Sequence, residues 1–385
     1  MKITSLESFL ANAGGRNFLF VRLTTDTGLT GLGEATLEWQ EKAVQTLLHD
    51  WVEAQVLGRD PFDIEAVIGE MIRNQYQGGP TVMTAISGVE IAMWDLIGKA
   101  CRQPVYQLLG GRCHAKIPAY ANGWFAGAKT PEDYAERAKD VVARGFRALK
   151  FDPFGVAWKG LTVEERETAV ALVARVRDAV GPAVKMMIEF HGRLSLPSAV
   201  ETIREMEKFN PTWCEEPVAP ESVELLANLK NQVSSRISAG ERHYNLAEFD
   251  RLMSLRAVDV VQPDIIHCGG IHIAKKIATL AAVKDIQIAP HTSEGPVALA
   301  AALHFDISTP NFFIQEDFSQ YDVPWRNDFV RGWNPFRYGE FFLSDEPGLG
   351  LGIDEKALVN HPYEPSPFAS LWHEDWLGDF TRRRS

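Results

Sequence analysis

The chain has 385 residues, of which 45% are hydrophobic and 23% are charged, and its formal net charge is −12. This length excludes a single small domain and fits two domains, or one barrel with an appended unit. The acidic balance argues against a nucleic-acid partner, because the one cluster of basic residues is the terminal Arg382–Arg384.

Further features of the sequence indicate a protein of the cytoplasm. The N-terminal segment has no apolar stretch of the signal-peptide kind, and no apolar run approaches the ~20 residues that span a membrane. The cysteines form no CxxC pair, which favours free thiols in a reducing compartment. They are Cys101, Cys113, Cys214 and Cys268. We therefore expect neither a membrane nor a nucleic acid among the partners.

Residues 1–112 predict an α+β domain. Apolar and polar residues alternate over residues 18–35 around the turn signal Asp26-Thr27-Gly28, which predicts antiparallel strands. A helical pattern follows over residues 82–100. The last segment, residues 331–385, again shows strand and turn signals, and we expect it to return to this domain and complete a cap.

Residues 113–330 alternate between strand-like and helix-like segments, which implies a parallel sheet. Eight such strands with seven helices predict a closed barrel whose last crossover is modified. The strand-like segments are 116–123, 147–152, 184–190, 212–217, 236–241, 259–264, 286–291 and 312–317. The helix-like segments are 131–145, 163–181, 196–209, 222–233, 245–257, 270–285 and 296–306.

Side chains suited to catalysis end these predicted strands at regular intervals. From the third strand onward they follow one another about every 25 residues, which is one βα unit. Catalytic groups of parallel barrels lie at the C-terminal ends of the strands, so we expect one polar cavity. The residues are Lys150 and Asp152, Glu189 and His191, Glu215, Glu241, Asp264, His291 and Glu316.

Glu189, Glu215 and Glu241 end three consecutive strands, and neighbouring strands lie about 5 Å apart. Three carboxylates this close raise one another's pKa unless a cation lies among them. Oxygen ligands suit a hard divalent ion, so Mg²⁺ is the expected cofactor and Mn²⁺ the second choice. The alternative is that each acid pairs with an arginine or caps a helix.

Asp264 and His291 end the next two strands and form a candidate dyad. A carboxylate that holds one ring nitrogen fixes the histidine's tautomer and raises its basicity, which predicts His291 as a general base. His191 is a candidate general acid opposite it. Lys150 would place a positive charge beside a carboxylate or, alternatively, form a Schiff base.

At these strand ends the sequence resembles the enolase superfamily, in its mandelate racemase-like branch, over nearly the whole chain. The motifs that carry this resemblance are EFHGR, CEEPV, AGER, QPD with HCGG, APH and IQE. A closer similarity to acid-sugar dehydratases comes from YQGGP, GLGEA and WHEDW. Similarity to gluconate dehydratases comes from KIPAYANGW and ALKFDPFG.

The resemblance implies a capping domain over a modified TIM barrel of (β/α)₇β type. It implies that Glu189, Glu215 and Glu241 bind Mg²⁺. It also implies a homo-oligomer with an even number of subunits (a dimer, tetramer or octamer).

The reaction that the resemblance implies is loss of water from a sugar acid, a gluconate- or galactonate-type aldonate. His291, backed by Asp264, would remove the proton α to the carboxylate, and Lys150 and Glu316 would help stabilise the enediolate. His191 would protonate the departing 3-hydroxyl, and the enol product would tautomerise to a 2-keto-3-deoxy acid.

The sequence departs from the family pattern at two positions. Glu189 stands where much of the family has Asp, and we expect its longer side chain still to reach the ion. The second strand ends in Lys150-Phe151-Asp152, where many racemases of the branch carry a Lys-x-Lys pair. The missing base lysine weakens a two-base racemase and favours a dehydratase.

Residues beside the strand ends are candidate substrate contacts: Asn122, Trp124, Asp152, Arg193, Arg16 and Tyr76. For Arg193 a structural salt bridge is an equal alternative. The last two lie in loops 14–17 and 76–79, which we expect to close the cavity, although their glycines alternatively serve only turns. Trp372, His373 and Trp376 are candidates for the site or for an interface.

Other functions stay open beside the dehydratase. An epimerase, racemase or cycloisomerase would use the same enediolate but keep the substrate's atoms. A Schiff-base aldolase would depend on Lys150. A catalytically silent barrel would bind or support another molecule, although the intact set of strand-end residues argues against it.

Overall fold

A closed barrel of parallel strands forms the centre of the fold. The computed structural model describes residues 1–76, 78–333 and 335–365. Within residues 117–317 the barrel strands pair in chain order, and β11 closes on β4. They are β4 (Ile117–Ala121), β5 (Ala148–Phe151), β6 (Lys185–Glu189), β7 (Trp213–Glu215), β8 (Ile237–Ala239), β9 (Val260–Val261), β10 (Gln287–Ile288) and β11 (Gln315–Asp317).

One helix follows each barrel strand except the last. Thr130 and Thr162 begin the first two of these helices with capping boxes, in which side chain and backbone satisfy each other reciprocally. The helices are α6 (Pro131–Ala143), α7 (Val163–Val180), α8 (Leu196–Met206, extended by η2, Glu207–Phe209), α9 (Val223–Lys230), α10 (Leu246–Ser254), α11 (Gly270–Val283) and α12 (Pro296–Ile307). The predicted (β/α)₇β barrel is therefore confirmed.

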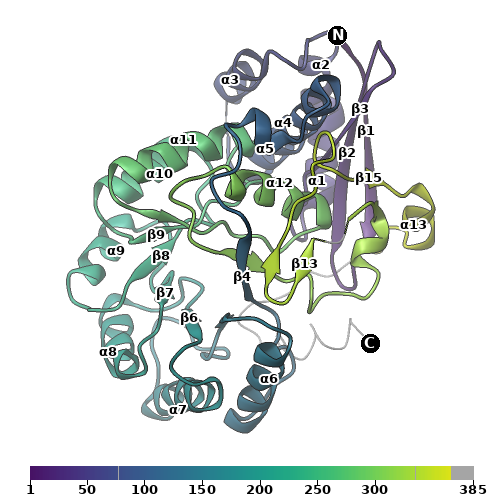
Figure 1. Ribbon diagram of the computed structural model, residues 1–385. Helices are drawn as coiled ribbons and strands as arrows, with labels where there is room; N and C mark the ends of the chain where they lie inside the picture. The colour runs from purple at the N-terminus through teal and green to yellow at the C-terminus, as the bar shows by residue number, and fades with distance from the viewer. Residues whose placement is uncertain (77, 334, 366–385) are drawn as a thin grey trace.

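The cap consists of an antiparallel sheet and helices from the first hundred residues. Its strands are β1 (Ile3–Asn12), β2 (Asn17–Thr25) and β3 (Thr30–Glu34), with the predicted turn between β2 and β3. Its helices are α1 (Glu41–Leu47), the π-helical η1 (Leu48–Val52), α2 (Glu53–Val56), α3 (Ile64–Asn74), α4 (Pro80–Cys101) and α5 (Val105–Leu108). Figure 1 shows the purple and dark blue cap against the green helices α11 and α12 of the barrel.

Helix α4 corrects one expectation from the sequence. It has 22 residues, and one 18-residue window reaches a mean hydropathy of 1.2, so in length and composition it is apolar enough to span a membrane. Within the described residues it is alone in this, and 83% of that window is buried inside the protein. Such burial is typical of a core helix. Its apolar residues pack on the cap sheet and on the barrel.

The C-terminal segment contacts both the cap and the barrel. It contains η3 (Arg326–Phe329), β12 (Val330–Arg331), β13 (Phe336–Arg337), β14 (Glu340–Phe341), β15 (Gly352–Ile353) and α13 (Glu355–Asn360). β14 pairs with β4 of the barrel, and the amide of Asn12 in the cap donates to the carbonyl of His361 over 2.9 Å. Domain boundaries at residues 112 and 330 remain our proposal. Trp372, His373 and Trp376 lie outside the described residues.

A buried carboxylate of the cap holds the start of barrel helix α12. Glu34, at the end of β3, accepts hydrogen bonds from the amides of Gly295 (2.7 Å), Val297 (3.1 Å) and Ala298 (2.9 Å). The hydroxyl of Thr36 donates to it as well, over 2.8 Å. The amides at a helix N-terminus lack partners within the helix and favour a negative charge. A side chain of the capping domain therefore accepts the hydrogen bonds of the first amides of a barrel helix, as an N-cap side chain does in other helices.

A second cap carboxylate does the same for helix α11. Glu90 in α4 accepts from the amides of Ile271 (2.8 Å) and His272 (2.7 Å), and from the indole of Trp94 (2.8 Å). Complete burial raises the pKa of Glu90 to about 8. The two glutamates thus bind the cap to the barrel at the helices that follow β9 and β10.

The attachment at Glu34 predicts that Gly295→Ala destabilises the protein. A Cβ at Gly295 would lie 2.5 Å from Glu34 Oε1, so the carboxylate has to leave the helix N-terminus. We expect a loss of about 1–3 kcal/mol in the free energy of unfolding, measured with denaturant. In the control Gly69→Ala, in α3, the new Cβ meets nothing within 4 Å. That variant should gain up to about 1 kcal/mol. Equal stability of both variants would contradict the role of Glu34.

Candidate active site

The strand-end residues point into the barrel because side chains alternate along a strand. Inside the barrel a small cluster is formed by Tyr120, Ala148, Met187, Trp213, Val260, Ala289 and Ile314. Two residues further along the same strands stand Asn122, Lys150, Glu189, Glu215, Gln262, His291 and Glu316. A spacing of two keeps side chains on the same face. The apolar layer is therefore followed by a polar layer at the C-terminal end of the barrel.

Glu189, Glu215 and Glu241 form a compact cluster in this polar layer. One carboxylate oxygen of each lies within 4.8 Å of the others. Glu189 and Glu215 are buried, and Glu189 Oε2 has no hydrogen-bond partner among the described residues. Burial, followed by the charge of Glu215, raises the pKa of Glu189 well above its usual range. Clustered oxygen donors with an unsatisfied carboxylate fit a hard divalent cation.

Lys150 lies among buried carboxylates. Its Nζ is 2.6 Å from Glu215 Oε1, 2.9 Å from Glu316 Oε1 and 3.3 Å from Glu189 Oε2. Burial disfavours its charge, but Glu215 and Glu316 outweigh burial and raise the pKa of Lys150 well above its usual range. Its side chain therefore stays an ammonium. This argues against the Schiff-base alternative, which needs a neutral amine.

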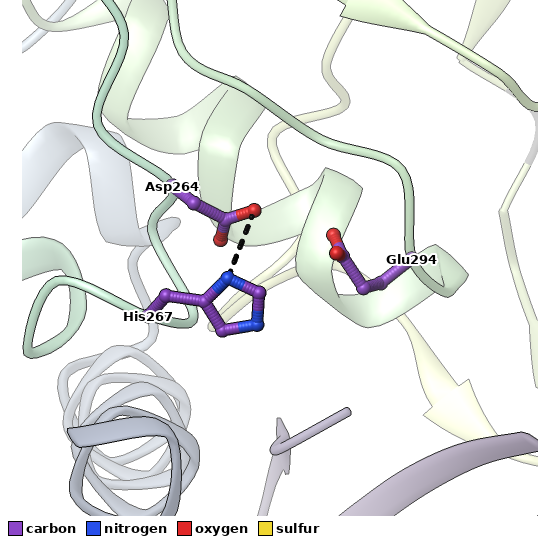
Figure 2. Close-up of side chains that lie close together, drawn as sticks. All are labelled: Asp264, His267 and Glu294. Atoms are coloured by element: carbon purple, nitrogen blue, oxygen red, sulfur yellow. Dashed lines mark ion pairs between the residues drawn. The ribbon is translucent and has the colours of Figure 1, made fainter. Parts of the chain in front are cut away.

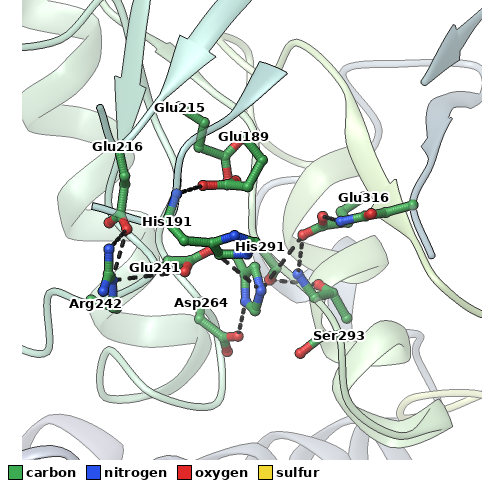
Figure 3. A network of polar contacts seen from close by, with 12 residues as sticks. Glu189, His191, Glu215, Glu216, Glu241, Arg242, Asp264, His291, Ser293 and Glu316 are labelled. Carbon is green, nitrogen blue, oxygen red and sulfur yellow. Dashed lines mark hydrogen bonds and ion pairs between the residues drawn. The ribbon is translucent and has the colours of Figure 1, made fainter. Parts of the chain in front are cut away.

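His291 and Asp264 are paired, as the strand-end pattern predicts. His291 Nδ1 lies 2.6 Å from Asp264 Oδ2, and Nε2 faces Glu241 at 3.5 Å and Glu316 at 3.8 Å (Figure 3). Because the carboxylate of Asp264 accepts from Nδ1–H of His291, the other ring nitrogen, Nε2, faces the carboxylate cluster. Burial opposes protonation, but the charges of Glu241 and Glu316 raise the pKa of His291.

A second His–Asp pair lies on the opposite side of the barrel. His191 Nδ1 is 2.7 Å from Asp152 Oδ2, and the His191 amide donates to Glu189 Oε1 over 2.7 Å. His191 has a left-handed backbone, with φ of 47°. Asp152 also forms an ion pair with buried Arg193. In one pair Asp152 follows β5 and His191 follows β6, and in the other Asp264 follows β9 and His291 follows β10. β6 and β10 are four strands apart in the eight-stranded barrel.

Asp152 and Arg193 contact each other beside His191. We expected both as substrate contacts, with a structural salt bridge as the alternative for Arg193. The guanidinium of Arg193 instead donates to Asp152 and, over 2.7 Å, to the carbonyl of Gly155. Asp152 contacts Arg193 and His191 through Oδ2, and its Oδ1 accepts from the amide of Phe154 over 2.9 Å. Both residues therefore support the histidine.

Three other expected substrate contacts form hydrogen bonds or ion pairs within the protein. Trp124 is 3% exposed, and its indole donates to the carbonyl of Lys150 over 2.8 Å, so it packs under the site. Asn122 donates to Glu316 over 2.7 Å and orients that carboxylate. Arg16, 4% exposed, pairs with two carboxylates and anchors the cap loop. Tyr76 is 96% exposed, which gives no support to a substrate contact.

Some polar residues of the site escaped the sequence analysis. The indole of Trp213 donates to Glu215 Oε2 over 2.9 Å, and Arg242 pairs with Glu216 beside the cluster (Figure 3). Gln262 follows β9, in the position that His291 holds after the neighbouring strand β10. A spacing of two residues along a strand is the signal that identifies both: Trp213 lies two residues before Glu215, and Gln262 lies two residues after Val260.

Comparison with known proteins agrees with this geometry. Residues 9–110 match the family model of the mandelate racemase/muconate lactonizing enzyme N-terminal domain. Residues 133–357 match the enolase C-terminal domain-like model.

Curated relatives include two sugar-acid dehydratases. The D-gluconate dehydratase of Thermoproteus tenax is 36% identical over 90% of this chain and 70% of its own length. The D-gluconate/D-galactonate dehydratase of Picrophilus torridus is 35% identical over 90% of this chain and 88% of its own length.

Solved structures place the chain in the same group. A mandelate racemase/muconate lactonizing enzyme from Jannaschia sp. CCS1 has a TM-score of 0.89 and 33% identity, and covers 94% of this chain and 98% of its own. Another from a Sulfitobacter species has the same TM-score and identity, and covers 94% and 96%. Both halves of the fold and the strand-end residues lead to one conclusion: the chain belongs to the mandelate racemase/muconate lactonizing enzyme family of the enolase superfamily.

Proposed function

We propose that this protein is a Mg²⁺-dependent dehydratase, a lyase that removes water from a gluconate- or galactonate-type aldonate. The observation that carries the proposal is a pair of His–Asp dyads on opposite sides of one carboxylate cluster. An elimination needs a base and an acid, each held in place. The printed names of the two curated relatives support the same substrate class.

The metal ligands in this proposal are Glu189, Glu215 and Glu241. Bound there, Mg²⁺ (or Mn²⁺) would supply positive charge where the substrate carboxylate gains negative charge on loss of its α-proton. The Lys150 ammonium adds a fixed positive charge at the same place. Glu316, oriented by Asn122, holds that ammonium.

The general base in this proposal is His291. In its neutral form His291 donates Nδ1–H to Asp264, so Nε2 has a lone pair to take the proton from C2 of the aldonate. A cation bound at the carboxylate cluster would offset the charge of Glu241 that raises the pKa of His291. The C–H electron pair moves into the carboxylate, giving an enediolate. Its collapse expels the 3-hydroxyl, which leaves as water once His191 donates a proton. The enol product then tautomerises to the 2-keto-3-deoxy acid.

The second dyad favours elimination over the isomerase alternatives. A two-base racemase would place a second base on β5, two residues beyond Lys150, but that position holds Asp152, which binds His191. An epimerase or cycloisomerase would use His291 in the same way and would not need an acid for a leaving hydroxyl. The product's mass distinguishes these reactions.

We also propose a cytoplasmic location. All four cysteines are free in the described part of the chain, and Cys101 and Cys113 are exposed, as suits a reducing compartment. The partner in this proposal is a small-molecule sugar acid. The even-numbered homo-oligomer stays a prediction.

Turnover of an aldonate tests the proposal directly. We expect the Mg²⁺-loaded protein to convert D-gluconate, D-galactonate or a stereoisomer to a 2-keto acid, detected as its semicarbazone, with loss of one water by mass spectrometry. An unchanged mass together with solvent deuterium at C2 would instead support an epimerase or cycloisomerase. Activity that survives chelation of divalent metal ions would contradict the metal-dependent mechanism.

The two histidines should be separable by isotope exchange. His291→Asn removes the base, so both deuterium exchange at C2 and dehydration should be lost. His191→Asn removes only the acid, so we expect dehydration to fall about 10²–10⁴-fold while C2 exchange continues. NMR in D₂O measures both reactions in one sample. Exchange that persists in His291→Asn but stops in His191→Asn would reverse the assigned roles.

The metal ligands can be tested without substrate. Glu215→Gln should weaken Mg²⁺ binding at least about 10-fold in calorimetry, because a neutral amide replaces a charged ligand. The matched control is Glu216→Gln. That carboxylate is the next residue, but it pairs with Arg242 and is not part of the cluster. Equal Mg²⁺ affinity of the two variants would count against the cluster as the metal site.

A further inference from the structure

A buried histidine with no part in the proposed reaction lies behind the base dyad. His267 follows β9 and is 7% exposed. Its Nδ1 is 3.5 Å from Asp264 Oδ2, and its Nε2 is 3.0 Å from the carbonyl oxygen of Thr36 in the cap. Figure 2 shows the carboxylate of Glu294 turned toward His267 and Asp264 from the loop that precedes α12. The ring therefore lies between the cap and the barrel.

Both neighbours of the His267 ring nitrogens are acceptors. A carbonyl oxygen cannot donate a hydrogen bond, and neither can an ionised carboxylate. A neutral imidazole has one N–H, so it would leave one of these two contacts without a proton. The doubly protonated ring satisfies both contacts, and the Asp264 carboxylate places negative charge beside Nδ1. Glu294 is a weaker source of charge, because burial, followed by the charge of Asp264, raises its pKa to about 7. Burial opposes this charge, but Asp264 and then Glu294 outweigh burial and raise the pKa of His267.

Asp264 is held from three sides. Its Oδ2 accepts from Nδ1 of His291 over 2.6 Å and also faces Nδ1 of His267. Its Oδ1 accepts from the amide of Ile266 over 2.9 Å. The carboxylate that orients the base thus takes its own orientation partly from His267.

The cap reaches the base dyad along two routes. Thr36 contacts His267 through its carbonyl, and its hydroxyl donates to Glu34. Glu34 holds the amide of Gly295, four residues beyond His291. One short cap segment therefore supports Asp264 on one side and the chain that follows His291 on the other.

We propose that His267 is a positioning residue for the general base. Held as an imidazolium between the cap and the barrel, it fixes Asp264 and, through Asp264, the ring of His291. His267, Asp264 and Glu294 also resemble a metal site, since a ligand atom of each lies within 4.8 Å of the others. Protonation of Nδ1 leaves no lone pair for a metal, so the cluster is a buried ion group. The inference adds a residue to the proposed mechanism. Its kinetic test rests on the proposed function, whereas the protonation state of His267 can be measured without substrate.

The protonation state tests the inference in the full-length protein without substrate. In ¹⁵N-histidine NMR, we expect both ring nitrogens of His267 to carry protons at neutral pH, where the ring of His304 is neutral. His267→Gln assigns the signal. His304 is the internal control: it is 1% exposed, its Nδ1 accepts from the amide of Tyr106, and burial lowers its pKa to about 4. A His267 ring that is neutral, like that of His304, would overturn the inference.

Two amide variants test the positioning role. In His267→Asn the amide nitrogen takes the place of Nδ1 and still reaches toward Asp264, whereas in His267→Gln it takes the place of Nε2 and reaches toward Thr36. We expect kcat to fall about 10–100-fold in His267→Gln, with a much smaller change in KM. His267→Asn should retain more of kcat than His267→Gln. Wild-type kcat in His267→Gln, or equal losses in the two folded variants, would overturn the proposal.

The two measurements separate this inference from the proposed function. If no aldonate is turned over, the dehydratase proposal fails, while the NMR measurement still determines the state of His267. If both variants fail to fold, as thermal unfolding would show, the spectrum of the unsubstituted protein decides. A neutral His267 in an active dehydratase would refute the inference alone.

Discussion

Negative charge gathered at one end of the barrel is the constraint on which the rest of the site depends. Six barrel strands end there in a carboxylate, and most of these side chains are buried. They are Asp152, Glu189, Glu215, Glu241, Asp264 and Glu316. Carboxylates cannot remain ionised together away from water unless cations lie among them. The protein therefore needs a positive partner beside each of them.

The positive partner of the carboxylate differs from one strand end to the next. This difference decides which chemical role we propose for each strand end. Lys150 balances Glu215 and Glu316 permanently, and Arg193 does the same for Asp152. Asp264 has two histidines beside it. In the Glu189–Glu215–Glu241 cluster the buried Glu189 Oε2 has no hydrogen-bond partner among the described residues, and the three carboxylates lie close together, which is why we propose the metal there. In the proposed mechanism fixed cations thus hold the scaffold, while histidines hold the protons that move.

The cap also uses buried carboxylates for its attachment to the barrel, but their hydrogen-bond partners are not cations. Glu34 and Glu90 are fully buried carboxylates whose partners are backbone amides at the starts of α12 and α11. Gly295 and Gly270 leave room for them, since a Cβ at either glycine would lie 2.5 Å or less from a carboxylate oxygen. Because these helices follow β10 and β9, the cap is fastened beside the strands that carry His291 and Asp264. The cap therefore meets the barrel close to the residues that we propose as the base dyad.

The sequence by itself determined the barrel, the carboxylate cluster and the base dyad. Each depends on local patterns: a strand with its helix repeats about every 25 residues, and alternation along a strand places Glu189, Glu215 and His291 on the inner face. Tertiary structure alone decided the contacts of Asp152, Arg193, Trp124 and Arg16, because their partners come from other segments of the chain. The same holds for Glu34 and Gly295, which are 261 residues apart in the chain. Local periodicity says which way a side chain points, and only the packed fold says what it meets there.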